Sequence, residues 1–194
     1  YQLARLYRYN GDQTRYEETL LTIIKDDEQY SAPEFSALRS ALQRTLKEQG
    51  INRLLILYRL QSDFSLKAHT YLGTFYYNNG QYNKAANHFL FAVITIFSNC
   101  IEEIRTRRPF YEFEEADTCL SIIMDNTLLR EYVLQNGLFV NLYYLASTLS
   151  IGGETAVPTD LWQLVATFSP SSVLKQRAER QLEEPFVETV LRNK

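Results

Sequence analysis

The chain has 194 residues, of which 45% are hydrophobic and 22% are charged. This balance is typical of a folded globular protein, and the length allows a buried core without disulfides. The formal net charge is −3, from 20 basic and 23 acidic side chains. A general nucleic-acid binder needs a basic surface that displaces counterions from phosphates, so the charge argues against that class.

The apolar runs of the chain are short, and the run from Leu90 to Phe97 is one of the longest. A membrane-spanning helix needs about 20 apolar residues, so we expect no transmembrane segment in this chain. The sequence begins with Tyr1 rather than Met and shows no signal peptide. We therefore expect that the natural N-terminus is missing, and we favour the bacterial periplasm or envelope narrowly over the cytoplasm.

Apolar residues recur at spacings of three and four and do not alternate, which predicts an almost entirely α-helical fold. In the first part of the chain we expect helices at about 1–9, 13–25, 31–49 and 51–60. Asn10 and Gly11 make the first turn, and Gly50 ends the third helix. The third helix starts at the tetrapeptide 31–34, because Ser31 caps its first turn and Glu34 holds the reciprocal capping position.

The stretch 72–92 carries a distinctive pattern: a Leu-Gly pair, an aromatic three residues after the Gly, an Ala nine further, an aromatic four on and an Ala three on. A glycine turn separates the two halves. The residues at these positions are Leu72, Gly73, Tyr76, Gly80, Ala85, Phe89 and Ala92. The pattern resembles the tetratricopeptide repeat (TPR), a helix–turn–helix unit of about 34 residues.

The resemblance implies an all-α, TPR-like solenoid of antiparallel helix pairs with a helical C-terminal extension. In such a pair Gly73 and Ala85 let the two helices approach closely, while Tyr76 and Phe89 fill the space beside the contact. Ala92 then admits the next repeat. One helix pair cannot bury its own apolar face, so neighbouring pairs must stack.

The first helix pair partly matches the repeat pattern of residues 72–92 at an offset of 69 residues: Tyr7 corresponds to Tyr76 and Gly11 to Gly80. This offset is close to two repeats of about 34 residues, so it predicts one intervening helix pair. We expect TPR-like repeats at about 1–26, 31–61 and 62–97. Ser62 and Asp63 would start the first helix of the third repeat.

No helix breaker occurs between Gln81 and Arg108, so we expect one long helix there, about twice the usual length of a second repeat helix. The regular array would then end at residue 108, and residues 109–194 would form degenerate repeats or a cap. Within that part we expect a loop at 151–159 and helices at 110–125, 128–135, 138–150, 161–168, 171–182 and from Pro185.

In the family that the chain resembles, the first helix of each pair lines the inner wall of a curved groove. The resemblance places six residues of this chain towards that groove: Lys67, Thr70, Tyr71, Thr74, Tyr77 and Asn78. Such a surface suits peptides through aromatic contact and hydrogen bonding, and a solvated helix face is the alternative interpretation. Only Lys67 fits the carboxylate clamp of chaperone-tail TPR proteins, so we do not expect that ligand.

The sequence shows no catalytic or metal-binding constellation. The two histidines, His69 and His88, lack partners at metal-ligand spacing, and we expect both to be structural. Adjacent glutamates on a helix do not face each other, so we interpret the Glu-Glu pairs as solvated surface residues and not as acid–base pairs. We favour buried free thiols over a disulfide for Cys100 and Cys119. We therefore expect neither an enzyme, nor a metal, nor a cofactor.

The first functional hypothesis is a protein–protein interaction scaffold that binds a peptide or partner domain on a concave helical surface. The alternative is a TPR-like small-molecule-binding accessory protein of a bacterial envelope transport system, with a pocket that includes Tyr71 and Tyr77. An all-helical enzyme is a third and weaker hypothesis. The 14 tyrosines leave a homo-oligomer open, because tyrosine suits interfaces.

Overall fold

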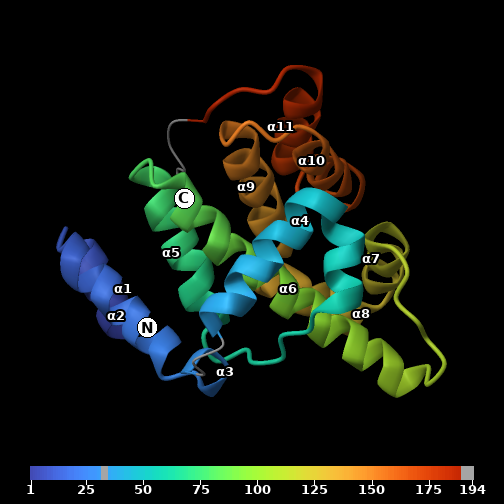
Figure 1. Cartoon of the computed structure of the whole chain (residues 1–194), viewed down its shortest axis with the longest axis horizontal. Coiled ribbons are helices and arrows are strands. Elements are labelled where there is room, and N and C mark those ends of the chain that lie inside the picture. The colour runs from blue at the N-terminus through green and yellow to red at the C-terminus, as the bar shows by residue number, and fades with distance from the viewer. Residues whose placement is uncertain (32–34, 189–194) are drawn as a thin grey trace.

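The computed structural model describes residues 1–31 and 35–188, and this part of the chain is all-α, with no strand (Figure 1). Its eleven helices are, in chain order, α1 (Gln2–Tyr9), α2 (Gln13–Lys25), α3 (Glu28–Ser31), α4 (Phe35–Leu57), α5 (Leu66–Asn78), α6 (Tyr82–Arg107), α7 (Ala116–Asp125), α8 (Thr127–Gln135), α9 (Leu138–Ile151), α10 (Ala156–Phe168) and α11 (Ser172–Glu183).

The N-terminal hairpin forms as its sequence predicts. Gly11 has a φ of 75°, which lets the chain reverse between α1 and α2. The Asp12 carboxylate caps α2 by accepting a hydrogen bond of 3.1 Å from the Arg15 backbone N–H. On the buried side of α2, the ring of Tyr16 packs edge-on against Phe75 of α5, with 5.6 Å between the ring centroids.

Helix α4 is broken at Gly50, where φ is 77° and ψ is −179°, so the predicted end of a helix at this glycine is confirmed. The second part of α4 ends at Leu57 rather than at Leu60, and α5 begins at Leu66 rather than at residues 62–63. The start predicted for the helix at 31–34 includes residues 32–34, which lie outside the described part of the chain.

The helices pack in a line of neighbours. Helix α2 packs against α1 and α5, α5 against α6, α6 against α9, α9 against α10, and α10 against α11. Helix α4 packs against α6, α7 and α10, and crosses in front of α6 in Figure 1. In a regular array the intervening pair would separate α2 from α5. The expected separation of α2 from α5 does not occur, because the buried face of α2 packs directly on α5.

Helix α6 is the central core helix, and its predicted length is confirmed. Its side chains are buried almost without interruption from Phe89 to Ser98. Among the described helices it is long and apolar enough to cross a membrane, which the short apolar runs of the sequence did not lead us to expect. However, 72% of that apolar stretch is buried inside the protein, as in any core helix.

Helices α5 and α6 cross at Gly73. A Cβ atom on this glycine would lie 2.6 Å from Cε1 of Phe89, so only glycine fits without a shift of the ring. Leu72, Ala85 and Ala92 are fully buried beside the crossing. Gly73 therefore leaves room for the ring of Phe89 where the two helices cross.

Three predicted boundaries in the C-terminal part are wrong. Helix α7 begins at Ala116 rather than at Phe110, and the Ala116 N–H donates to the Asn52 side-chain oxygen at 2.9 Å. Helix α10 begins at Ala156, because Pro158 sits in its first turn, where a proline costs no backbone hydrogen bond. Residues 185–188 are not helical, and the remainder of that predicted helix lies outside the described residues.

Candidate functional site

Tyrosine side chains and their partners link α1, α5, α9 and α11, and we call this set of contacts the tyrosine face. The residue that precedes α1, Tyr1, packs against Tyr71 of α5, and Tyr77 of α5 packs against Tyr144 of α9, with ring centroids 6.3 and 5.1 Å apart. Gln181 of α11 then contacts the hydroxyl of Tyr143 on α9 at 3.3 Å. These contacts therefore join helices that are distant in sequence.

The six residues of α5 predicted to line a groove separate into three groups. Tyr71, Thr74 and Asn78 line a cleft between α5 and the α1–α2 hairpin. Thr70 and Tyr77 instead contact α9 and the C-terminal segment: Asn141 donates to the Thr70 hydroxyl at 3.1 Å, and Tyr77 is buried. The remaining residue, Lys67, is exposed and does not line the cleft.

The cleft has a volume of about 300 Å³. The rings of Tyr16 and Phe75 form an aromatic wall, and the polar groups that line it come from Arg8, Gln13, Tyr71, Thr74, Asn78 and Asn79. Burial raises the pKa of Tyr16, so its hydroxyl is neutral at physiological pH. The cleft therefore offers aromatic surface with hydrogen-bond donors and acceptors, and one cation, Arg8.

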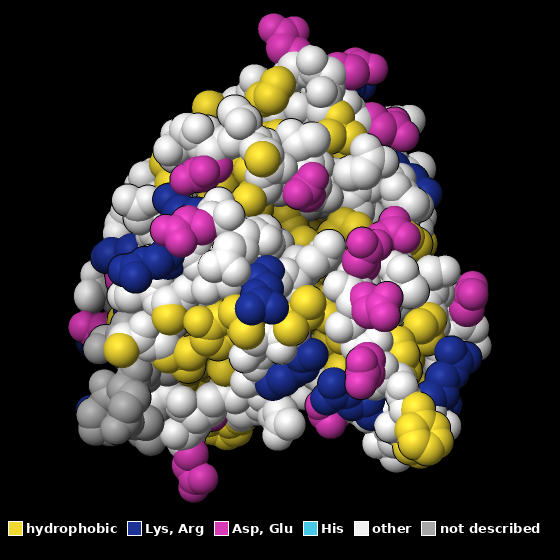
Figure 2. Space-filling model, turned by 45° about the vertical axis from the view of Figure 1, so that its right-hand side comes forward, with side chains coloured by type: hydrophobic (Ala, Val, Ile, Leu, Met, Phe, Trp, Pro, Cys, Tyr) yellow, Lys and Arg dark blue, Asp and Glu magenta, His cyan; other side chains and the backbone are white. Residues whose placement is uncertain are grey.

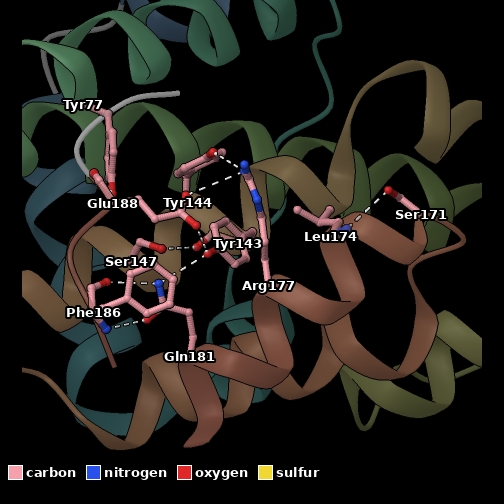
Figure 3. A network of polar contacts seen from close by, with 10 residues as sticks. All are labelled: Tyr77, Tyr143, Tyr144, Ser147, Ser171, Leu174, Arg177, Gln181, Phe186 and Glu188. Carbon is pink, nitrogen blue, oxygen red and sulfur yellow. Dashed lines mark hydrogen bonds and ion pairs between the residues drawn. The ribbon is translucent and has the colours of Figure 1, made fainter. Parts of the chain in front are cut away.

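The other end of the tyrosine face is covered by residues 184–188, which follow α11 and run past α9 towards α5 (Figures 1 and 3). Gln181 is fully buried and forms two hydrogen bonds with one residue of this segment. Its side-chain NH2 donates to the Phe186 carbonyl at 3.0 Å, and its oxygen accepts from the Phe186 N–H at 2.9 Å. The segment is thus held through its backbone.

The carboxylate of Glu188 lies among tyrosines (Figure 3). The Tyr143 hydroxyl donates to it at 2.8 Å, and the Arg177 guanidinium lies 3.7 Å from its second oxygen. The Tyr77 hydroxyl donates to the Glu188 backbone carbonyl at 3.0 Å. Only 12% of the Glu188 side chain is exposed, so its charge is held largely out of water beside one cation.

Burial raises the pKa of Tyr77, Tyr143 and Tyr144, and the nearby Glu188 carboxylate raises each pKa further. These hydroxyls therefore stay protonated, and those of Tyr77 and Tyr143 donate hydrogen bonds to Glu188, whereas the Tyr144 hydroxyl accepts one from Arg177. Tyr143 and Tyr144 pack edge-on with ring centroids 5.0 Å apart, which fixes where their hydroxyls lie. In this cluster, one hydroxyl donates to a carboxylate and another to a backbone carbonyl.

The two histidines lie together at the interface of α5 and α6, with their Nδ1 atoms 3.0 Å apart. Desolvation lowers the pKa of both His69 and His88, so both rings are neutral at physiological pH and one donates to the other. No group of metal-ligand side chains occurs among the described residues. The pair therefore acts in packing, where its ring contacts include Tyr76 stacked on His88.

The cysteines are also structural. Cys100 and Cys119 are free and buried in the core, which confirms the prediction of two thiols. Burial raises the pKa of both groups, that of Cys119 to about 11. Their thiolate fraction at physiological pH is therefore very small, so their reactivity in this environment is low.

Comparison of the chain with protein-family models, curated proteins and solved structures finds no match. The fold is all-α, and no family is identified by these comparisons.

Charged side chains of both signs are interspersed with apolar ones on the surface that Figure 2 shows.

The sequence identified one part of the tyrosine face and missed the other. The repeat pattern pointed to α5, and with it to Tyr71, Thr74 and Asn78. It gave no signal for Gln181 or Glu188, since their partners lie in other helices and in a non-helical segment. The high tyrosine content suggested an interface but did not say where it lies.

Proposed function

We propose that the protein is an interaction scaffold that binds a peptide or a partner segment on the tyrosine face. The observation that carries this proposal is the cleft of about 300 Å³ between α5 and the α1–α2 hairpin. It combines aromatic walls with amide and hydroxyl groups, which together bind side chains and backbone of a peptide. The mechanism is passive, since the face holds a partner segment without chemical change.

The order of packing supports a TPR-like interpretation of this face. The pairs α1–α2, α5–α6 and α9–α10 follow one another in the line of neighbours. We interpret them as the stacked units of a solenoid, with α3–α4 and α7–α8 as insertions between units. Helices α1, α5 and α9 are then the first helices of their pairs, which line the inner wall in TPR proteins.

The test is capture of a partner from native extract with chemical cross-linking and mass spectrometry, by the wild type and two variants. Asn78→Arg places a bulky cation in the cleft at the last residue of α5. Gln135→Arg is the matched control, because Gln135 is the exposed last residue of α8 and does not line the cleft. Arginine near a helix C-terminus is favourable in both places.

We expect a partner that the wild type and Gln135→Arg retain and Asn78→Arg loses, with cross-links to α1 or α5. A partner that both variants retain would place the binding surface elsewhere and refute the proposal. Circular dichroism and thermal melting of each variant would establish that a loss of binding is not a loss of fold.

A small-molecule binder, such as an accessory protein of an envelope transport system, is the second candidate, and the volume of the cleft favours it. Pockets for small molecules begin at about 300 Å³. Tyr71 lines the cleft as this hypothesis requires, whereas Tyr77 is buried elsewhere. A small molecule that raises the melting temperature of the wild type but not of Asn78→Arg would support this candidate over the peptide scaffold.

A further inference from the structure

We propose that Tyr77, Tyr143, Arg177 and Gln181 form a recognition site, the C-terminal clamp, for an extended peptide that carries a glutamate. We further propose that the chain's own residues 184–188 occupy this site as an internal ligand, which a peptide of the same chemistry displaces. The inference deepens the proposed function, because the clamp lies on the same tyrosine face, although it uses none of the cleft residues.

The first element of recognition is the backbone. Gln181 pairs with both the N–H and the carbonyl of Phe186, as paired residues of neighbouring antiparallel strands do. An N–H and a carbonyl of one residue point to the same side only where the backbone is extended, so this pairing selects an extended ligand. Glu184, which begins the segment, is also extended, with φ −147° and ψ 101°.

The second element is the carboxylate. Glu188 lies two residues after the residue that Gln181 holds, and its carboxylate accepts from Tyr143 and faces Arg177. Hydrogen bonds to a charged group are stronger than neutral ones, and the low exposure of this carboxylate strengthens them further. The clamp therefore specifies an acidic residue at that position.

The segment itself is bound as a ligand rather than packed as a core element. Residues 184–187 are all exposed, including 44% of Phe186 and 53% of Val187. The clamp side chains Tyr77, Tyr143 and Gln181 are instead buried. Since no side chain at 184–187 is buried in the core, the attachment of the segment depends mainly on polar contacts that an equivalent peptide reproduces.

Withdrawal of residues 184–188 from the clamp also leaves polar groups without hydrogen-bond partners. When residues 184–188 withdraw, Gln181 loses both of its hydrogen bonds to Phe186, and Tyr143 loses its carboxylate acceptor, while the contact between Gln181 and Tyr143 remains. Unpaired buried polar groups are costly, so the empty clamp favours rebinding of the segment or of a peptide with the same groups. The exposed side chains at 186 and 187 indicate that the clamp tolerates variation there.

The test uses a fluorescein-labelled, C-terminally amidated peptide with the sequence of residues 182–188, and fluorescence polarisation with the full chain. The internal ligand is weakened by the double substitution Phe186→Pro and Glu188→Ala, which removes the N–H that Gln181 holds and the carboxylate. A second peptide carries glutamine in place of Glu188. Adding Arg177→Gln to the double variant tests the clamp at a half-exposed side chain.

We expect the peptide to bind the double variant at least about tenfold more tightly than the wild type, because the internal ligand leaves only a small open fraction in the wild type. The glutamine peptide and the Arg177→Gln chain should each lose about tenfold in affinity. Equal binding to the wild type and the double variant, no binding to either, or equal binding of the two peptides would each overturn the proposal.

A second measurement does not depend on the folding of the double variant. The photoreactive residue p-benzoylphenylalanine replaces Val187, whose side chain is exposed and follows the residue that Gln181 holds. In an equal mixture of light and isotope-labelled chains, we expect cross-links to α5, α9 or α11 within one chain only, and their loss on adding excess peptide. Cross-links between light and heavy chains, or cross-links that excess peptide leaves unchanged, would refute an internal, displaceable ligand.

The two proposals fail separately. If the peptide does not bind but Asn78→Arg still loses a partner that the wild type captures, the clamp proposal is refuted and the cleft proposal stands. If the peptide binds as expected but no captured partner depends on the cleft, the cleft proposal is refuted and the clamp proposal stands.

Discussion

Gly73 of α5 lies directly against the ring of Phe89 on α6, and a Cβ atom at position 73 would stand 2.6 Å from Cε1 of that ring. This is closer than two non-bonded carbon atoms approach, so the side chain at one position limits the side chain at the other. The contact sits at the centre of the helix pair that the repeat pattern identified.

The substitution Gly73→Ala should destabilise the protein by about 1–3 kcal/mol, because the ring of Phe89 must move in a well-packed core. Phe89→Leu, which shortens the opposing side chain, should recover part of that loss in the double variant. The free energies of unfolding in urea for the two single variants and the double variant provide the test. Strictly additive losses would show that the two residues do not restrict each other.

The side chain of Asp27 should contribute to stability, although it lies in the charged link between α2 and α3. It is 3% exposed and accepts hydrogen bonds from the hydroxyls of Ser62 and Ser65 at 2.9 and 2.6 Å. Asp27→Ala should cost about 1–3 kcal/mol, because both hydroxyls lose a charged acceptor. The neighbouring Asp26→Ala, at an exposed position, is the control and should change the urea midpoint much less.

The histidine pair should make the protein less stable as the pH falls. The pKa of both His69 and His88 is lowered in the folded state, chiefly by burial, from an ordinary value of 6.5. Below about pH 6.5 the unfolded chain therefore binds protons that the folded chain does not, so the free energy of unfolding decreases as the pH decreases. Melting temperatures between pH 8 and pH 5 should show this loss.

The matched variant for the pH experiment is His69→Gln with His88→Gln, which removes both titrating rings and keeps side chains that form hydrogen bonds. Its melting temperature should depend less on pH over the same range. An equal slope in the wild type and the variant would assign the acid sensitivity to other groups.

The two thiols should react slowly in the native protein. Burial raises the pKa of Cys100 and Cys119, so few thiolates are present at pH 8. Iodoacetamide followed by mass spectrometry should find both cysteines unmodified in the native state and both modified in urea. Rapid native labelling of either one would mean that the core opens locally at α6 or α7.

Local signals in the sequence predicted much of the fold. Gly50 marks a helix break, residues 82–107 form one helix, and Gly73 meets Phe89, because each of these features depends on neighbouring residues or on one helix pair. The start of α7 was misplaced because Phe113 is buried without being helical, so an apolar side chain at a plausible spacing gave a false helical signal.

The order in which helices stack was harder to predict. Repeat spacing counts residues along the chain and does not say which faces meet, so the direct packing of α2 on α5 was missed. The same limit applies to the site. The pairing of Gln181 with Phe186 joins a helix to the segment that follows it, and no periodicity in the sequence marks such a contact.

The central position of α6 has a consequence for cooperativity. In a strictly linear array each unit touches only its neighbours, and the ends can melt independently of the middle. Helix α6 instead contacts α4, α5 and α9, so elements from both halves of the chain share one surface. Heat should therefore melt this protein in a single transition, with equal calorimetric and van't Hoff enthalpies, rather than unit by unit.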